Sequence, residues 1–556
     1  MPVLDRHPYL GKPSANAVGY PLQSVSGGEI MPVITLYRQL QGRLPSGETT
    51  PRSALIREDA SPLQAQRETL DIVCRRLSAA KVSYFCVRPM PGHPPVVAVA
   101  QRDRERALTT LASIGKPLLA ARLPYGKRAR GRAPDEIGRM RPLKRVAAQL
   151  HDAWAVRVGL YFTSPSRTLT IGPEHGCDLE FWAKQKGMLI APRPNPACAS
   201  VPAKAKAVQG GEELFNTLVS AGQGVRTYRT RPEFTRRLVG DIDFPIDAVY
   251  TWVDGADPAW RARRDQALAE GGGPAGALSE MATTEARFTS REELRYSLRS
   301  LLTYAPWINR VWIVTAGQTP PWLDTTHPMV RVVDHKEIFN DPSVLPVFNS
   351  HAIETQLHHI DGLAEHFIYL NDDFFLGKPL SPRTFFEANG ITRFFPSLAH
   401  VPFGAPESEE SPVHAAGMNN RRMLEDLSGR TLTQKLKHAP YALRRSVLYE
   451  LEERFNDEFE ATSRSRFRRT SDISAVSSLA HYYSYLNGRA VPGNVEYTYV
   501  DLSLRKTPAK LRRMLARRWH DAFCLNDTAP TTAEQDALLG RFLKAYYPTP
   551  TPFELP

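Results

Sequence analysis

The clearest chemical signal in the sequence is a pair of adjacent carboxylates, Asp372 and Asp373, directly preceded by Asn371. They follow an apolar run, His366–Leu370, whose composition predicts a buried strand. In open α/β sheets, ligands bind beyond the carboxyl ends of the strands. Neighbouring carboxylates repel each other, and Mg²⁺ or Mn²⁺ relieves that repulsion by taking carboxylate and phosphate oxygens. We therefore expect Asp372 and Asp373 to bind a metal, with Asn371 contacting substrate; the alternative is a solvated or capping turn.

A second predicted strand, Ile246–Val253, also ends in acids and a glycine turn. Asp254 is a candidate for contact with a nucleotide, a metal or an acceptor hydroxyl. Asp257 precedes Pro258 and is explained equally well as the residue that initiates the turn.

Asn349, Ser350 and His351 begin a predicted amphipathic helix that extends to Ile360. The free amides of a helix N-terminus favour anions, so these residues are candidates for binding substrate phosphate. The alternative is that Asn349 or Ser350 serves only as the helix cap.

Basic residues follow further along the chain. His438 is suited to accept a proton near neutral pH, and Arg444 and Arg468 to clamp phosphate oxygens. The alternative is a solvated helix face with a capping histidine, within a run predicted to be helical over 440–486.

The elements around these residues predict an α/β fold. From residue 246 to 380 the pattern is β-α-β-β-α-β, typical of an α/β sheet with helices on its faces. Ser290 and Glu293 have the spacing of a capping box before the first long helix. The remaining elements of this stretch are the strands Arg310–Thr315 and Val330–Asp334 and the helix Arg291–Leu302.

The rest of the chain predicts an N-terminal α/β accessory region and helical C-terminal insertions. We expect a short helix near Ile34–Leu40 and another near Glu212–Ala221. The predicted divisions are an irregular segment 1–60, a small α/β module 61–123, a basic linker 124–150, a β-rich region 151–240, a catalytic domain 241–530, and a C-terminal helix and tail 531–556.

Composition restricts the setting. The net charge of +13 favours anionic partners, and five scattered cysteines without a C-x-x-C pair argue against a disulfide scaffold and a cysteine zinc site. No signal peptide and no run of 18 apolar residues is apparent. We expect a cytoplasmic enzyme; peripheral attachment at the inner face of the membrane and homo-oligomer formation stay open.

Long segments of the chain resemble sequences of the Stealth family of phosphotransferases. This family includes bacterial capsular-polysaccharide enzymes and the catalytic subunit of GlcNAc-1-phosphotransferase. GCDLEFW (176–182) and APRPN (191–195) are similar to the N-terminal extension of actinobacterial members. Four signature regions occur in order: IDAVYTWVDGADP (246–258); 291–323 with 348–380, which ends in HFIYLNDDFFLGKPL; KHAPYAL (437–443) with RFRRTSDI (466–473); and FCLND (523–527).

The resemblance implies transfer of a hexose-1-phosphate, commonly GlcNAc-1-phosphate from UDP-GlcNAc, to a carbohydrate polymer with release of UMP. It also implies a Rossmann-like mixed sheet core with helices on both faces, and it places Asp372 and Asp373 at the metal. Asp254, His438, Arg444 and Arg468 would lie in the catalytic pocket. We expect Arg291, Arg444 and Arg468 to neutralise phosphate charge. Many members carry Asn where this chain has Asp254, which makes Asp247 the alternative acid.

Several questions stay open at this stage. The general base is His438 or a nearby Asp. A glycosyltransferase that releases a nucleoside diphosphate, and a non-catalytic protein that binds an anionic polymer, are the two alternatives to a phosphotransferase. Nucleic acid is not expected as a partner, because the basic clusters lack interleaved aromatic residues.

Overall fold

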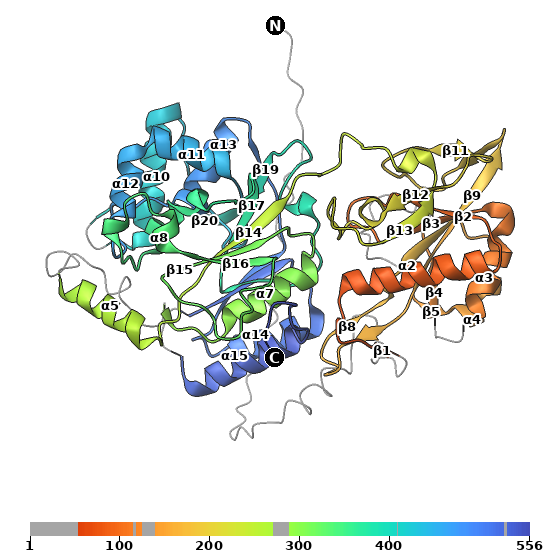
Figure 1. Ribbon diagram of the computed structural model, residues 1–556, viewed down its shortest axis with the longest axis horizontal. Helices are drawn as coiled ribbons and strands as arrows, with labels where there is room; N and C mark the ends of the chain where they lie inside the picture. Colours follow the sequence, from red (N-terminus) through yellow and green to blue (C-terminus); the bar gives the residue numbers. More distant parts are fainter. Residues whose placement is uncertain are drawn as a thin grey trace, which may run out of the picture.

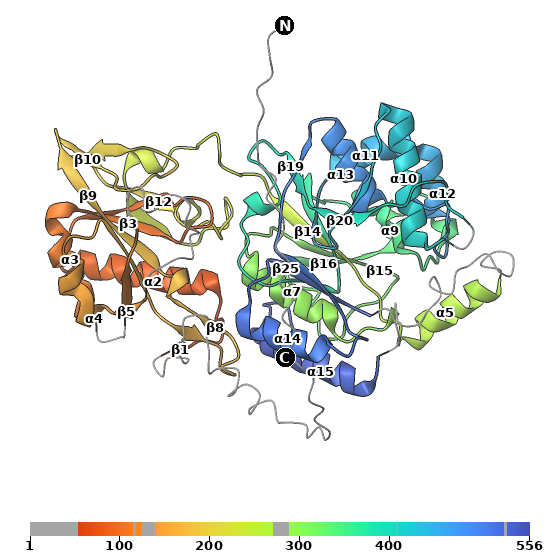
Figure 2. The same cartoon turned by 180° about the vertical axis from the view of Figure 1, so that it is seen from behind.

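The computed structural model describes residues 54–114, 118–124, 139–270, 288–407, 410–527 and 531–555. Two units lie side by side in Figures 1 and 2, one built from the first part of the chain and one from residue 246 onward. The predicted helix near Ile34–Leu40 and the central part of the predicted basic linker lie outside the described residues.

The N-terminal unit is built on one eight-stranded mixed sheet. The sheet takes β3 from the predicted module 61–123 and β9 from the predicted region 151–240, and these two strands pair in parallel. The two regions therefore share one sheet and one apolar core, which corrects the predicted division between them. The predicted helix at Glu212–Ala221 is reduced to a 3-10 turn, Glu212–Leu214. The main elements are α2 (Pro62–Ala79), β2 (Tyr84–Val87), β3 (Val96–Ala100), α3 (Arg104–Ala112), β4 (Leu119–Arg122), β6 (Ala155–Gly159) and β9 (Cys177–Gln185).

The second unit contains a five-stranded sheet in the order β16-β15-β14-β17-β22. The first four strands are parallel and β22 is antiparallel, so the predicted mixed α/β core is confirmed. The central strands are almost wholly apolar because helices cover both faces of the sheet (Figure 1). The strands are β14 (Ile246–Thr251), β15 (Val311–Thr315), β16 (Val330–Asp334), β17 (His366–Asn371) and β22 (Tyr441–Arg444).

Two helical predictions need correction. The run 440–486 begins with β22, so Leu443 pairs with Phe367 in the sheet rather than facing a helix neighbour. The helix predicted to begin through a Ser290–Glu293 capping box begins instead after Glu292, which has a left-handed backbone and makes no side-chain cap. The helices of this unit are α5 (Pro258–Ala269), α7 (Glu293–Tyr304), α8 (His335–Ile338), α9 (Ser350–Glu354), α10 (Pro412–Ser428), α11 (Arg445–Arg454), α12 (Asn456–Ser463) and α13 (Ala480–Leu486).

A small three-stranded sheet completes the second unit. Its central strand β25 (Ala522–Asn526) pairs antiparallel with β18 (Phe374–Leu376) and parallel with β24 (Tyr497–Asp501). Helix α14 (Thr507–Arg517) precedes β25 and helix α15 (Ala533–Tyr546) follows it. Residues from Leu539 to Phe553 pack into the main core, so the predicted tail 531–556 is part of this unit.

Hydrogen bonds connect the two units. Ser220 Oγ and Gln223 Nε2 donate to the backbone carbonyls of Trp307 and Ile308, at 2.8 and 3.1 Å. Arg518 donates to the carbonyl of Thr168 at 3.3 Å. Within the described part of the chain, no helix is long and apolar enough to cross a membrane.

Candidate active site

The acidic pair lies at the carboxyl edge of the main sheet, where Asp372 and Asp373 link β17 to β18. Asp373 Oδ2 accepts hydrogen bonds from Cys524 Sγ at 3.1 Å and Asn526 Nδ2 at 2.9 Å. Asp373 Oδ1 is buried and has no hydrogen-bond partner among the described residues. Burial raises the pKa of Asp373 to about 7 even though the Cys524 thiol lowers it. Burial, and then the charge of Asp373, raise the pKa of Asp372 well above its usual range.

These features fit a divalent cation. A buried carboxylate oxygen without a partner beside a second acid is costly unless a positive charge compensates it. The atoms present are the oxygen ligands that Mg²⁺ and Mn²⁺ prefer. Burial raises the pKa of the Cys524 thiol well above its usual range, so this group stays a protonated donor to Asp373 rather than a thiolate ligand.

His438 lies against the acidic pair. One ligand atom each of Asp373, His438 and Cys524 falls within a 4.8 Å span. The His438 ring packs edge-on against Phe374, at 4.4 Å between centroids, and Nδ1 lies 3.4 Å from the Tyr441 hydroxyl. Burial, and then the charge of Arg468, lower the pKa of His438 to about 4. The imidazole is therefore neutral at pH 7 and has a lone pair available for a proton.

Arg468 is held beside this histidine. Its Nη2 donates to Ser350 Oγ at 2.5 Å, while its Nε is buried without a hydrogen-bond partner among the described residues. Arg468 thus has donor capacity left for an anionic ligand.

Tyr369 Oη donates to Glu354 Oε1 at 3.3 Å, and burial raises the pKa of Glu354 to about 7.

Two predicted catalytic residues lie at the opposite edge of the sheet. Asp247, near the start of β14, accepts hydrogen bonds from Asn309 Nδ2 (2.8 Å), Trp312 Nε1 (2.9 Å) and the Ala364 amide (3.0 Å). Arg444 pairs with Glu365 at 2.9 Å, because antiparallel β22 ends where β17 begins. We correct both assignments: these side chains connect elements at the amino end of the strands.

Two further candidates, Asn349 and Arg291, have their polar atoms engaged within the protein, and a third, His351, is buried beside an acid. Asn349 caps α9, since its Oδ1 accepts from the His351 amide at 3.1 Å, and its Nδ2 donates to Asp472 at 2.8 Å. This is the capping alternative. The His351 ring is buried, with Nδ1 3.9 Å from the Asp472 carboxylate. Arg291 pairs with Asp527 at 2.9 Å and Asp536 at 2.7 Å, and so ties α7 to the C-terminal segment.

The structure places Asp254 and Asn371 at the same edge as the acidic pair. Thr251 of β14 and Asn371 of β17 are in register, so both strands end at one level. Asp254 shapes the turn after β14: its amide donates to Gln318 Oε1 at 3.0 Å, and its Oδ1 accepts from the Ala256 amide at 2.9 Å. Asp257 caps α5, as the turn interpretation predicts.

Comparison with known proteins agrees with this geometry. The conserved regions of Stealth proteins match in order: region 1 over residues 244–272, region 2 over 287–394, region 3 over 437–485 and region 4 over 512–556. An exopolysaccharide phosphotransferase of Streptomyces coelicolor is 45% identical over 90% of this chain and 85% of its own length. The exopolysaccharide phosphotransferase CpsY of Mycobacterium tuberculosis is 34% identical over 94% and 93%. The chain belongs to the Stealth family. The predicted family and the predicted phosphotransferase class are thereby confirmed.

All four Stealth regions contribute to the site. Region 1 carries Asp254, region 2 the acidic pair and region 3 His438 with Arg468, while region 4 supplies the two donors to Asp373.

The crystal structure of the galactosyltransferase LgtC with donor and acceptor sugar analogues aligns with 55% of this chain and 97% of its own, at 9% identity and a TM-score of 0.29.

Sequence reasoning missed four residues of the site. Cys524 and Asn526 lie in the FCLND segment, which was recognised without a role for its individual residues. Glu354 follows Ser350 by one helical turn, and this spacing was the available signal. Tyr369 lies within an apolar strand and carried no signal of its own.

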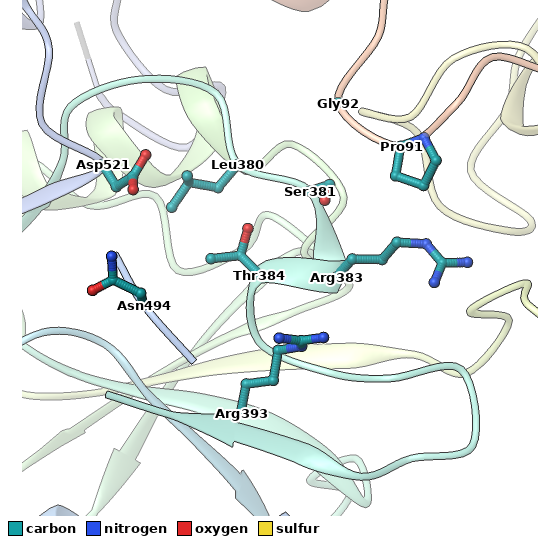
Figure 3. Close-up of a pocket in the computed structure, with 9 residues that line it drawn as sticks. All are labelled: Pro91, Gly92, Leu380, Ser381, Arg383, Thr384, Arg393, Asn494 and Asp521. Carbon is teal, nitrogen blue, oxygen red and sulfur yellow. The ribbon is translucent and has the colours of Figure 1, made fainter. Parts of the chain in front are cut away.

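A separate pocket of about 300 Å³ lies where the two units meet (Figure 3). It is lined by Pro91 and Gly92 of the N-terminal unit and by residues of the second unit that include Leu380, Arg383 and Arg393. The Arg383 side chain points toward the N-terminal unit (Figure 3). Asp372, Asp373 and His438 do not line this pocket, so it is distinct from the candidate site.

Proposed function

We propose that this protein transfers a hexose-1-phosphate, with GlcNAc-1-phosphate from UDP-GlcNAc as the first candidate, to a hydroxyl of a carbohydrate polymer. The reaction forms a phosphodiester and releases UMP, on the cytoplasmic side, in capsular or cell-wall polysaccharide synthesis. The observation that carries the proposal is the half-buried acidic pair, beside Arg468 and the neutral His438. One oxygen of this pair, Asp373 Oδ1, is buried and has no hydrogen-bond partner in the described part of the chain. The phosphotransferase relatives support the same chemistry.

The protein's own groups have distinct tasks in this scheme. Asp372 and Asp373 would hold Mg²⁺ or Mn²⁺, which when bound supplies positive charge for the pyrophosphate. Arg468, fixed by Ser350, neutralises the remaining negative charge. Positioning and charge neutralisation provide most of the catalysis in phosphoryl transfer.

The bond changes are as follows. The acceptor oxygen attacks the phosphorus nearer the sugar, and the bond from that phosphorus to the UMP oxygen breaks. His438 Nδ1 is engaged with the Tyr441 hydroxyl at 3.4 Å, so in this scheme Nε2 accepts the proton of the acceptor. The negative pyrophosphate raises the pKa of His438 from about 4, which makes the ring a stronger base when substrate is bound.

Glu354 acts as a positioning residue. It is buried, and it accepts from Tyr369, so it does not reach the acceptor. Its contribution is to orient the Tyr369 hydroxyl and to place a carboxylate near Arg468.

The nucleotide released from UDP-GlcNAc tests the proposal. The full chain is incubated with Mg²⁺ or Mn²⁺ and a glycan acceptor, and the products are separated by ion-exchange chromatography. UMP that disappears on chelation is expected, and Asp373→Asn should abolish it whereas Asp247→Asn, at the far edge, should not. Release of UDP would place the attack on the anomeric carbon and identify a glycosyltransferase instead. Salt-sensitive polymer binding without turnover of any nucleotide sugar would identify a polymer-binding protein.

A further inference from the structure

A second cluster of metal-ligating side chains lies at the amino end of the main sheet, away from the acidic pair. It consists of His358 and His359, in the 3-10 turn after α9, and Glu452 of α11. His358 Nε2 and His359 Nε2 lie 2.8 and 2.9 Å from the same oxygen, Glu452 Oε2. Three potential ligand atoms, two imidazole nitrogens and one carboxylate oxygen, therefore lie within 4.8 Å of one another.

The hydrogen bonding of His359 directs its Nε2 at the Glu452 carboxylate. His359 Nδ1 lies 2.9 Å from the carbonyl of Ile338, and a carbonyl can only accept, so Nδ1 carries the hydrogen. Nε2 is therefore the ring nitrogen that faces Glu452 Oε2, at 2.9 Å. A cation bound there in place of the Nε2 proton would join the two atoms.

The surroundings supply the outer contacts that a metal site requires. A ligating histidine usually donates its other N–H to a carbonyl or carboxylate, as His359 does to Ile338. The ligating carboxylate is also oriented, since Asn340 Nδ2 donates to Glu452 Oε1 at 3.1 Å.

Access and burial differ within the cluster in a way that suits an ion from solvent. The His358 side chain is fully buried, and its Nδ1 has no hydrogen-bond partner among the described residues. The side chains of His359 and Glu452 are 12% and 18% exposed, which leaves one side open for entry and for a water ligand.

We propose that His358 Nε2, His359 Nε2 and Glu452 Oε2 bind a Zn²⁺ ion, with water as the fourth ligand. Two imidazoles and one carboxylate are a ligand set that zinc takes in tetrahedral geometry. Tetrahedral ligands about 2.0–2.1 Å from zinc are roughly 3.3 Å apart, so the present contacts need to open by only a few tenths of an ångström.

Such an ion would hold the end of the segment that carries part of the active site. Ser350, which holds Arg468, and Glu354 precede the cluster on the same segment. The metal would tie that segment to α11 and to the Ile338 carbonyl. Its role in this position is structural, because the cluster lies at the edge of the sheet opposite the acidic pair.

Zinc titration of the full chain tests the proposal. The protein is stripped with a chelator, desalted, and titrated with Zn²⁺ by calorimetry in excess Mg²⁺, with Co²⁺ absorption as a second measure of tetrahedral binding. One tight zinc per chain is expected in the wild type and in Asp372→Asn/Asp373→Asn, and neither His359→Ala nor Glu452→Ala should retain it. Asn340→Ala, at an exposed side chain, should keep the fold and weaken zinc binding by about 10–100-fold.

His414→Ala is the matched control, because His414 forms an ordinary surface pair with Glu410. Its zinc affinity should equal that of the wild type. Absence of stoichiometric zinc in the wild type would overturn the proposal and leave a His359–Glu452 ion pair. Equal zinc affinity in the wild type, Glu452→Ala and Asn340→Ala would show adventitious binding at other histidines.

Discussion

At the scale of single residues, the site carries an electrostatic conflict between adjacent carboxylates, which protonation or a bound cation resolves. Asp372 and Asp373 are adjacent and poorly solvated, and Glu293 adds further negative charge. The protein supplies Asp373 with two neutral donors, Cys524 and Asn526, but with no direct positive partner among the described residues. Binding sites commonly pay for function in stability in this way.

Asp373→Asn should therefore abolish activity and stabilise the metal-free protein above neutral pH. The pKa of Asp373 is about 7 in the folded protein and near 3.8 when unfolded, so the native state binds the extra proton between these values. Wild-type stability accordingly falls as pH rises through that window, and the asparagine variant lacks this loss. Urea unfolding at pH 4, 6 and 8 with a chelator should show an advantage for the variant that grows with pH. A constant difference would contradict the raised pKa.

His438→Ala should lower kcat by about 10²–10⁴-fold, the usual contribution of a general base. KM for the nucleotide sugar should change little, because Arg468 and the acidic pair remain. Steady-state kinetics across pH 5–9 measure both quantities. Arg444→Ala, which removes a basic side chain at the opposite edge of the sheet, is the control. An unchanged kcat in His438→Ala would remove this residue from the proton transfer.

At the scale of elements, the parallel pairing of β14 with β17 places the candidate catalytic residues at one end of the strands and the structural contacts at the other. Their carboxyl ends carry Asp254 and the acidic pair, whereas their amino ends carry Asp247 and the contacts of Glu365 with Arg444. The same strands thus present two polar edges with different tasks, and strand direction decides which edge binds ligand.

Asp247→Ala is expected to destabilise the fold without changing the chemistry. The substitution leaves the donors of Asn309, Trp312 and Ala364 without their acceptor, at a cost of about 1–3 kcal/mol for each buried group left unpaired. Denaturant unfolding should show the loss, while kcat of the folded fraction stays at the wild-type value. A large fall in kcat with intact stability would return Asp247 to the list of catalytic acids.

The strands of the core and the acidic pair were predictable because an apolar run followed by paired acids is a local pattern. Asp247 and Arg444 were misassigned because both lie in signature segments, and nothing local shows at which edge of a sheet a residue lies. Arg444 in particular needed the direction of β22, which was read as helix. Glu354, Cys524 and Asn526 reach the site only through tertiary packing.

At the scale of the whole molecule, the N-terminal unit has an electrostatic core of its own. Asp178 of β9 forms ion pairs with Arg157 on the neighbouring strand and with Arg193, which also pairs with Glu180 at 2.8 Å. These groups belong to the N-terminal sheet and not to the polar contacts with the second unit.

Asp178→Ala should cost about 3–5 kcal/mol, because it leaves two arginines without their buried partner. Proteolysis should then cut within residues 55–240 first, and kcat of the remaining folded protein should be unchanged. A parallel loss of kcat would mean that the N-terminal unit holds the catalytic unit in its active form.

The pairing of β18 with β25 also determines when the active site can form during protein synthesis. The oxygen of Asp373 is oriented by side chains about 150 positions later, Cys524 and Asn526. On the ribosome, Asp372 and Asp373 are incorporated into the nascent chain long before β25 is available to pair with β18. The centre therefore stays unfinished while about 150 further residues are translated, and catalytic competence arrives only when β25 has emerged.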